Sequence, residues 1–467
     1  SCSEMSAKGE VGIKIDLDQV PLREEGMNSY EIMLSESQER MLVVIEKGFE
    51  KELVVIFDKW DLHCTQIGEV TNSKMLEVYH GNDKVAEIPS KELVLGGGAP
   101  EYDMPIKEPE YFSKINNFSI TSILEPNDYN KTLLTLLSSP NITSKRFIYN
   151  QYDSTVQSNT TQGPGGDGAV IRLKGTPKGL AISTDCNGRY VYLNPRMGGK
   201  IAVAEAARNV ICSGGDPIAI TNCLNFGNPQ DPEIYWQFKE AVSGIGEACR
   251  SLNTPVTGGN VSFYNETGES SVYPTPVIGM VGILESITQN TTMEFKDEGD
   301  FIVTLGALNG SIGGSEYLRT IYGKVQGPIP NINLELEMGV QELCLEAIKD
   351  GIIKSAHDIS DGGLAVNISE SLVNSKSGLG VKLDVTRKLR NDELLFGECQ
   401  SLIIVTLNES ALYKLILLSK RLDVHTQTIG RVTDTASLVI NNLVNIPRKK
   451  LEDAYFNSLE NIMGQSG

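Results

Sequence analysis

Polar residues follow two apolar runs of the sequence, and their types suit contacts to a nucleotide and a metal ion. One apolar run ends in Asn222, and a second, residues 255–257, leads into Gly259, Asn260 and Ser262. Glycine lets a phosphate approach the backbone, an amide oxygen is a neutral ligand for hydrated Mg²⁺, and a hydroxyl can donate to an anionic oxygen. A glycine turn that needs positive φ is the alternative. The convergence of polar residues from two predicted strands favours a site.

A second cluster places a carboxylate and a guanidinium at the end of a predicted strand. Asp185 and Arg189 close the apolar run 180–184, with Asn187 between them. Strand ends beside glycine-rich turns are where α/β sheets place ligands. A turn stabilised by Asp and Asn side chains explains the same residues equally well.

A glycine-rich stretch, residues 305–316, follows a predicted strand and leads toward a helix. Gly313 and Gly314 could present backbone N–H groups to a phosphate at the helix N-terminus. The stretch lacks the lysine of a Walker A loop and the glycine spacing of a Rossmann fingerprint. A flexible turn is therefore an equally good interpretation.

Two carboxylates, Asp358 and Asp361, lie between His357 and a predicted helix that includes residues 365–372. Either carboxylate suits the N-cap of that helix, and this structural role is favoured over contact with a ligand. The chain has only four histidines, and the pattern of a Ser/His/Asp triad or a zinc site does not occur.

Two regions of the chain are copies of one another, and the first copy has no counterpart for the N-terminal part of the second copy. Three pairs of segments align: 12–17 with 380–385, 36–38 with 398–400, and 67–71 with 429–433, the last two pairs without a gap between them. Solenoid and propeller arrays use much shorter periods, so the repeat predicts a duplicated domain pair. We expect about 260 residues of the intact duplication to precede Ser1.

Composition limits the kinds of partner. The chain has 467 residues, with 60 acidic against 41 basic and a formal net charge of −19, which argues against nucleic acid or an anionic membrane surface. Eight cysteines without a C-x-x-C pair indicate reduced, structural thiols. No long apolar run or secretory signal pattern occurs, so the sequence predicts an unanchored cytoplasmic protein.

Periodicity and composition predict an α/β (α+β) protein of several domains. Residues 1–95 read as the end of an α/β unit, with strands at 11–17, 40–46, 65–70 and 76–79 and a helix at 49–60. Residues 96–112 read as a linker, rich in glycine, proline and charge. Residues 113–292 carry short strands and long helices, among them 199–212 and 232–251, and residues 293–467 rebuild the α/β unit from a strand at 300–306.

Together these segments closely resemble the PurL family, the synthetase subunit of phosphoribosylformylglycinamidine synthase. The segments that carry the resemblance are 185–189, the helix after Gly198, Gly199 and Lys200, 225–229, 258–262 and 357–364. The wider superfamily includes aminoimidazole ribonucleotide synthetase, selenophosphate synthetase and thiamine-phosphate kinase. The resemblance implies barrel-forming A domains that alternate with α/β B domains, so the chain would hold the end of the first B domain (1–95), the second A domain (113–292) and the second B domain (293–467).

The resemblance also implies a ligase reaction. ATP would activate the formyl amide oxygen of formylglycinamide ribonucleotide as an iminophosphate, and ammonia would displace the phosphate, with Mg²⁺ and positioning doing most of the work. The chain shows no glutaminase elbow cysteine, so ammonia would come from a separate PurQ-type glutaminase subunit joined through a small PurS-type subunit.

Site roles follow residue by residue from the matching motifs. The implied substrate contacts are Glu36, Ser37, Gln38 and Ser262, the ATP contacts are Asn222 and Gly259, and the Mg²⁺ ligand is Asn260. Further candidates for nucleotide or phosphate contact are Asp185, Arg189, Gly313, Gly314, Asp358 and Asp361. Many family members have Asp where this chain has Asn222, so a charge is missing there. The family's catalytic His and its other ATP and Mg²⁺ ligands match the part expected before Ser1, so no catalytic residue is assigned in this chain.

Two other functions fit the same residues. The chain could be a non-catalytic scaffold that binds nucleotide structurally and recruits a glutaminase, in which case it would bind ATP without turnover. Another superfamily kinase is disfavoured by the duplication, because those relatives build their barrel from two separate chains. Cys399 at the position of Ser37 predicts that the second, pseudo-equivalent site has diverged from catalysis.

Overall fold

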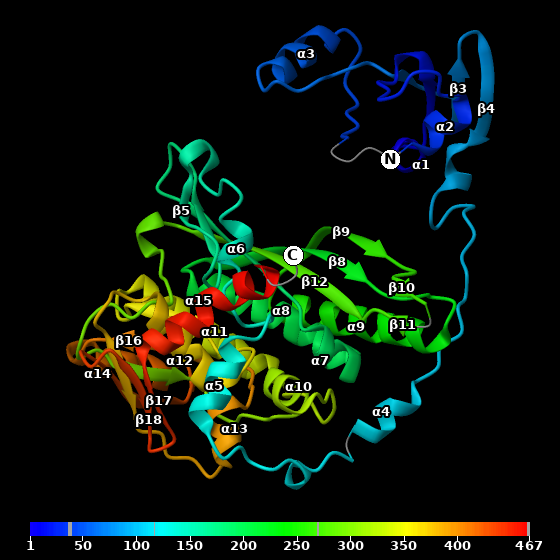
Figure 1. Cartoon of the computed structure of the whole chain (residues 1–467). Coiled ribbons are helices and arrows are strands. Elements are labelled where there is room, and N and C mark those ends of the chain that lie inside the picture. The colour runs from blue at the N-terminus through cyan, green and yellow to red at the C-terminus, as the bar shows by residue number, and fades with distance from the viewer. Residues whose placement is uncertain (36–39, 116, 269, 465–467) are drawn as a thin grey trace. The chain divides into compact units, whose positions relative to one another are not determined.

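The computed structural model describes residues 1–35, 40–115, 117–268 and 270–464. The chain forms two compact units, Ser1–Asp103 and Met104–Gly467 (Figure 1). The change from one unit to the other falls inside the predicted linker, residues 96–112.

The first unit is a four-stranded mixed sheet with short helices. Its strands, in spatial order, are β2 (Gly68–Thr71), β1 (Gly12–Asp16), β3 (Met75–His80) and β4 (Asp83–Pro89). Its helices are α1 (Cys2–Lys8), α2 (Ser29–Leu34) and α3 (Glu50–Asp58). A small core forms where Ile13, Ile15, Leu76 and Val78 meet Ile32 of α2.

The second unit contains a six-stranded sheet whose helices cover one face. In spatial order the strands are β5 (Thr160–Gln162), β6 (Ala169–Arg172), β7 (Gly179–Asp185), β12 (Thr275–Leu284), β8 (Asp216–Asn225) and β9 (Val256–Ser262). Every second residue of β12 is buried, as expected for a strand with one covered face. The covering helices are α8 (Pro195–Cys212) and α9 (Pro232–Ser251), preceded by the short α7 (Gly188–Leu193). A small hairpin of β10 (Glu266–Thr267) and β11 (Ser270–Ser271) lies after β9.

The same unit contains a seven-stranded sheet that is covered on both faces. In spatial order the strands are β14 (Ser355–Asp358), β16 (Ile403–Leu407), β13 (Phe301–Leu305), β17 (Thr426–Thr433), β15 (Gly380–Leu383), β18 (Ser437–Ile440) and β19 (Val444–Pro447). All residues of β13 and β16 are buried. Alternate residues of the two strands enter two separate cores, Ile302 and Ile404 in one and Val303 and Val405 in the other.

Helices from distant parts of the chain cover this sheet. They are α10 (Glu316–Tyr322), α11 (Leu334–Lys349), α12 (Gly363–Asn374), α13 (Asn391–Phe396), α14 (Glu409–Arg421) and α15 (Arg448–Gly464), with α5 (Tyr129–Leu137) and α6 (Arg146–Tyr149) from the start of the unit. The preceding helix α4 (Glu110–Ile115) packs instead against α7 and α9, through Tyr111 on Tyr192 and Phe112 on Trp236. Leu133, Leu136 and Leu137 of α5 lie in the same core as residues of α12 and α15. The Thr143 hydroxyl donates to the Tyr455 carbonyl at 2.6 Å. Part of the segment 113–292 therefore packs with the C-terminal α/β unit.

The pairing register of the strands confirms the repeat. In the first unit Gly12 pairs with Thr71 and Ile13 with Val70, and in the second unit the aligned residues pair in the same way, from Gly380 with Thr433 onward. The parallel partner strands β3 and β18 also match, residue for residue. Asp61 and Asp423, which align, both have positive φ, 56° and 53°. Two copies of one fold explain this agreement, because register is fixed by which face is buried.

The predicted strand at residues 40–46 is wrong. Its counterpart β16 lies between β13 and β14, but the described residues before Gly12 form only α1 and offer no such neighbours. A strand needs a hydrogen-bonding partner, so the segment stays irregular. The exposed fraction of Met41 is 86%, whereas that of the aligned Ile403 is 0%.

Most other predicted elements are confirmed, and one helix has the predicted bounds. Helix α9 begins after Asp231, whose carboxylate accepts from the Glu233 N–H at 2.8 Å, and Pro232 occupies its first turn. The glycines at 258 and 259 form no turn, because they lie inside β9 and neither has positive φ. Within the described ranges, no helix is both long and apolar enough to cross a membrane.

Candidate functional site

The predicted nucleotide and metal contacts lie on two neighbouring parallel strands. Strand β8 pairs with β9 so that Asn222 is opposite Gly259, and Asn225 is opposite Ser262. Successive residues of a strand point to opposite faces. Asn222 and Gly259 therefore share one face of the sheet, and Asn260 and Ser262 share the other.

Asn222 and Gly259 are in close contact. A Cβ atom on residue 259 would lie 2.0 Å from Asn222 Oδ1 and 2.7 Å from the Asn222 carbonyl oxygen. Any side chain at position 259 would therefore displace Asn222. The glycine is required here by this close approach and not by a special backbone conformation.

Asn260 and Ser262 lie on the exposed outer strand of the sheet. Asn260 is exposed, and no described residue hydrogen bonds to its side chain, so its amide oxygen is available to a cation. The Ser262 hydroxyl lies 3.2 Å from Asn265 Oδ1 and donates to it. Among the residues that the structure describes, no group of three His, Cys, Asp or Glu side chains is placed to hold a metal ion. Asn260 fits Mg²⁺ as a single neutral ligand, and phosphate and water oxygens usually complete such a shell.

The predicted substrate contacts Glu36, Ser37 and Gln38 lie outside the described residues. Their counterparts in the second copy are described and are buried. The Glu398 carboxylate accepts from the N–H groups of Glu316 and Gly362, at 2.8 and 2.9 Å, and from the hydroxyl of a tyrosine. Protein groups thus occupy its lone pairs. Burial, aided by a nearby carboxylate, raises the pKa of Glu398 to about 8.

Arg189 and Asp361, both candidate phosphate contacts, bind each other. The Arg189 guanidinium forms ion pairs of 2.9 Å with Glu316 and 3.1 Å with Asp361. Asn187 accepts from the N–H groups of the first turn of α7 and donates to Asp361 at 3.0 Å. Asn187 therefore has a structural role, as the N-cap of a helix that the sequence did not predict, and not in a turn.

The glycine-rich stretch is a packed loop. The Gly314 N–H donates to the carbonyl of Gln326 at 2.9 Å, and the Gly313 N–H donates to the Ser311 hydroxyl at 3.3 Å. Both glycines are buried. Their N–H groups are used inside the protein, so the loop does not present them to a phosphate.

The predicted N-cap role of Asp358 and Asp361 is wrong. Helix α12 is capped by Gly362, which has a φ of 81° and no side chain. Asp358 instead forms a buried ion pair with Arg208 Nε at 2.5 Å. Arg208 is fully buried and also binds Glu337 at 2.9 Å. Arg208 and Glu337 are residues that sequence reasoning missed, because they lie far apart in the chain.

Several carboxylates gather around Arg208 and Arg189. Burial raises the pKa of Asp358 to about 7, against the opposing effect of Arg208. Burial and the charge of Asp358 raise the pKa of Asp185 well above its ordinary value, and burial also raises that of Asp361. The predicted role of Asp185, Asp358 and Asp361 as nucleotide or phosphate contacts stays a prediction.

His357 joins two parts of the second unit that are distant in sequence. Its Nδ1 lies 2.9 Å from Asp167, and its Nε2 lies 3.3 Å from Glu370. Burial alone would lower the pKa of His357, but these carboxylates outweigh burial and raise it well above its ordinary value. Both ring nitrogens face carboxylate oxygens, an arrangement that favours the protonated ring. No pattern in the sequence predicts that Asp167 contacts His357.

Two family models match the chain. Residues 165–284 match the model described as AIR synthase related protein, N-terminal domain. Residues 1–81 and 297–441 both match the model described as AIR synthase related protein, C-terminal domain. The predicted fold class is thereby confirmed, and the α/β unit occurs twice.

Curated relatives match almost the whole chain. The chain is 46% identical over 466 residues to the phosphoribosylformylglycinamidine synthase subunit PurL of Alkaliphilus metalliredigens, covering 99% of this chain and 63% of that protein. It is 45% identical over 458 residues to the protein of the same name from a Thermoanaerobacter species, covering 97% and 62%. The chain thus spans less than two thirds of the length of these relatives, and what precedes Ser1 stays a prediction.

Solved structures of PurL from Thermotoga maritima share the fold. The complex with ATP has a TM-score of 0.59 at 25% identity and covers 92% of this chain and 61% of that chain. The complex with FGAR has a TM-score of 0.62 at 25% identity and covers 92% and 59%. The structure described as PurLQS has a TM-score of 0.60 at 25% identity and covers 92% and 61%.

Proposed function

We propose that this chain is part of the PurL subunit of a phosphoribosylformylglycinamidine synthase, an ATP-dependent ligase of purine biosynthesis. In this reaction the amide oxygen of formylglycinamide ribonucleotide attacks the γ-phosphorus of ATP and ADP leaves. Ammonia then adds to the iminophosphate carbon and phosphate departs, which gives the amidine. The observation that carries the proposal is the 46% identity to a PurL subunit across 99% of this chain.

The paired strands β8 and β9 would supply nucleotide and metal contacts. Gly259 and Asn260 are adjacent on the edge strand β9, so the Gly259 backbone would contact the nucleotide beside Asn222, and Asn260 would give a neutral oxygen to the Mg²⁺ bound to that nucleotide. When bound, Mg²⁺ neutralises phosphate charge during transfer. Ser262 would contact the ribonucleotide substrate, whereas the predicted substrate contacts at 36–38 lie outside the described residues. Asn222 carries no charge, so it would act by hydrogen bonding alone.

The second copy of the substrate-binding segment would have a structural role. Glu398 and Gln400 already bind protein groups, since Gln400 Oε1 accepts from Arg208 at 2.9 Å. Both side chains are buried among these protein groups. We therefore propose that the protein has one catalytic site and that residues 398–400 stabilise the second copy of the fold.

Ammonia would come from partner subunits. The PurLQS structure of Thermotoga maritima contains a protein similar to this chain, which supports a PurQ-type glutaminase and a PurS-type subunit as partners. Free ammonium should replace both partners in an assay, because the synthetase step needs only ammonia.

The test is ATP-dependent conversion of formylglycinamide ribonucleotide with ammonium. It compares this chain alone with the chain joined to the additional length that the curated relatives have. We expect turnover only in the longer form, and loss of most turnover in Asn260→Ala but not in Val256→Ala at the other end of β9. Tight ATP binding with no turnover in the longer form would support the scaffold function instead. Turnover by this chain alone would refute the expectation that the catalytic residues lie elsewhere.

A further inference from the structure

A groove lies between helices α5, α10 and the start of α15, away from the strands discussed above. Its volume is about 790 Å³, and it is widely open to solvent. Figure 1 shows these helices side by side, and α5 packs against both of the others. One face of α5 lines the groove with Lys131, Leu134 and Thr135, and Ser138 follows at the end of the helix. Residues three or four positions apart lie on the same face of a helix.

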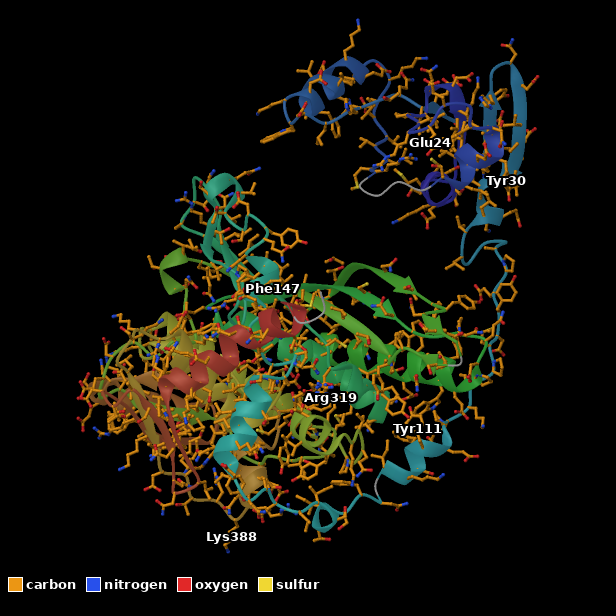
Figure 2. All side chains as sticks on the ribbon, in the orientation of Figure 1. Glu24, Tyr30, Tyr111, Phe147, Arg319 and Lys388 are labelled. Carbon is orange, nitrogen blue, oxygen red and sulfur yellow. The ribbon has the colours of Figure 1, made fainter. Side chains whose placement is uncertain are left out.

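Three cationic side chains from three helices converge on this groove. They are Lys131 of α5, Arg319 of α10 and Lys450 of α15 (Figure 2 labels Arg319). Lys131 and Lys450 are exposed, and no carboxylate of the described residues lies within ion-pair distance of either. Lys449, by contrast, forms an ion pair of 2.9 Å with an aspartate one turn further on. In a chain with a net charge of −19, this local excess of positive charge favours an anionic ligand.

Arg319 is only partly used by the protein. Its Nε and Nη2 donate to Glu316 at 3.0 and 2.7 Å, while its Nη1 has no acceptor among the described residues. Arg189 neutralises the same Glu316 from the other side at 2.9 Å. Arg189 also pairs with Asp361 at 3.1 Å, so Glu316 balances much of the charge of Arg319, and the excess positive charge at the groove comes from Lys131 and Lys450.

The groove also presents oxygens that can only accept. The hydroxyls of Thr135, Ser138 and Thr320 already donate to oxygens of their own helices, at 2.9, 2.9 and 2.7 Å. A hydroxyl has one hydrogen, so each of these oxygens has only lone pairs left for a ligand. Asp128, whose Oδ1 accepts from the Lys131 N–H at 3.0 Å, adds a carboxylate oxygen. These acceptors suit a ligand that carries hydrogen-bond donors, such as sugar hydroxyls, beside its anionic group.

We propose that this groove binds a sugar phosphate. The phosphate would lie against Lys131, Arg319 and Lys450, and the sugar hydroxyls would donate to Thr135, Ser138, Thr320 and Asp128. The inference goes beyond the proposed ligase activity and does not depend on it.

The test is titration calorimetry of this chain with ribose 5-phosphate, inorganic phosphate and free ribose. We expect ribose 5-phosphate to bind at least tenfold more tightly than inorganic phosphate, and free ribose not to bind at millimolar concentration. Lys131→Ala and Lys450→Ala should each weaken ribose 5-phosphate binding about tenfold or more, because each removes a charge-assisted hydrogen bond. Lys449→Ala is the matched control and should bind within twofold of the unaltered chain.

Four results would overturn the inference. The first is that ribose 5-phosphate does not bind at millimolar concentration, and the second is that inorganic phosphate binds as tightly as ribose 5-phosphate. The third is that Lys131→Ala and Lys450→Ala both bind ribose 5-phosphate as the unaltered chain does. The fourth is that Lys449→Ala loses as much affinity as these two variants. Ser262→Ala separates this groove from the proposed active site. If Ser262→Ala abolishes binding and Lys450→Ala does not, the ligand occupies the other site and the groove inference fails, while the ligase proposal stands.

Discussion

Replacing Arg208 by methionine should strongly destabilise the second unit. Arg208 is fully buried and holds Asp358 at 2.5 Å and Glu337 at 2.9 Å. Methionine fills a similar volume but leaves both carboxylates without their cation. Removing one partner of a buried ion pair costs about 3–5 kcal/mol.

The loss should grow with pH. In the unaltered chain the pKa of Asp358 is about 7, so Asp358 releases its proton between pH 6 and pH 8. Without Arg208 this pKa rises further, so the folded variant keeps the proton across the same range. The variant therefore loses stability more steeply, and the difference between the two proteins should widen by about 1.4 kcal/mol from pH 6 to pH 8.

Urea unfolding followed by tryptophan fluorescence measures this loss. The chain has two tryptophans, Trp60 in the first unit and Trp236 on α9 of the second. A Trp60→Phe background reports the second unit alone. Arg196→Met is the matched control, because Arg196 is 51% exposed and pairs with Glu247, so its loss should cost less than about 1 kcal/mol. Equal losses in Arg208→Met and Arg196→Met, or a loss independent of pH, would refute the reasoning.

Two further predictions concern pH and the candidate nucleotide contact. The second unit should lose stability as pH rises from 6 to 9, because folded Asp358 (pKa about 7) and Glu398 (pKa about 8) hold protons that the unfolded chain releases near pH 4. In the same urea titration, Asp358→Asn should make the loss of stability between pH 6 and 8 less steep. A stability that rises with pH would contradict this prediction. Gly259→Ala should cost about 1–3 kcal/mol of stability by overpacking against Asn222, and it should weaken ATP binding. Gly258→Ala is the control and should change neither stability nor ATP binding, because no atom lies within 4 Å of a Cβ at that position. Equal effects of the two substitutions in thermal unfolding and ATP titration would show that Asn222 moves aside.

Local patterns in the sequence predicted the elements whose signals are also local. Helix α9 has the predicted bounds because Asp231 and Pro232 mark its start and its apolar face repeats along its whole length. The repeat predicted the match between β1 and β15, since aligned strands with the same buried face must take the same register.

The remaining features depend on contacts between distant residues. The strand predicted at 40–46 has suitable residues but no neighbouring strands in the described first unit. Asp358 looked like a helix cap because caps are the commonest use of aspartate before a helix, whereas its partner Arg208 lies 150 positions earlier. A turn at glycines 258 and 259 was the alternative to a site, and the sequence could not decide between the two because the need for Gly259 depends on Asn222, which lies on another strand.

The shared register of the two sheets gives the chain an internal comparison. Gly68 and Gly430 occupy the same position in the two copies, and a Cβ on either would strike a carbonyl oxygen of the aligned lysines, Lys14 at 2.0 Å and Lys382 at 2.3 Å. The same alanine substitution at both positions therefore creates the same local clash, once in a thinly covered sheet and once in a sheet covered on both faces. If the two substitutions lower stability by different amounts, the difference shows how far the layers that cover each sheet determine the cost of the same backbone clash.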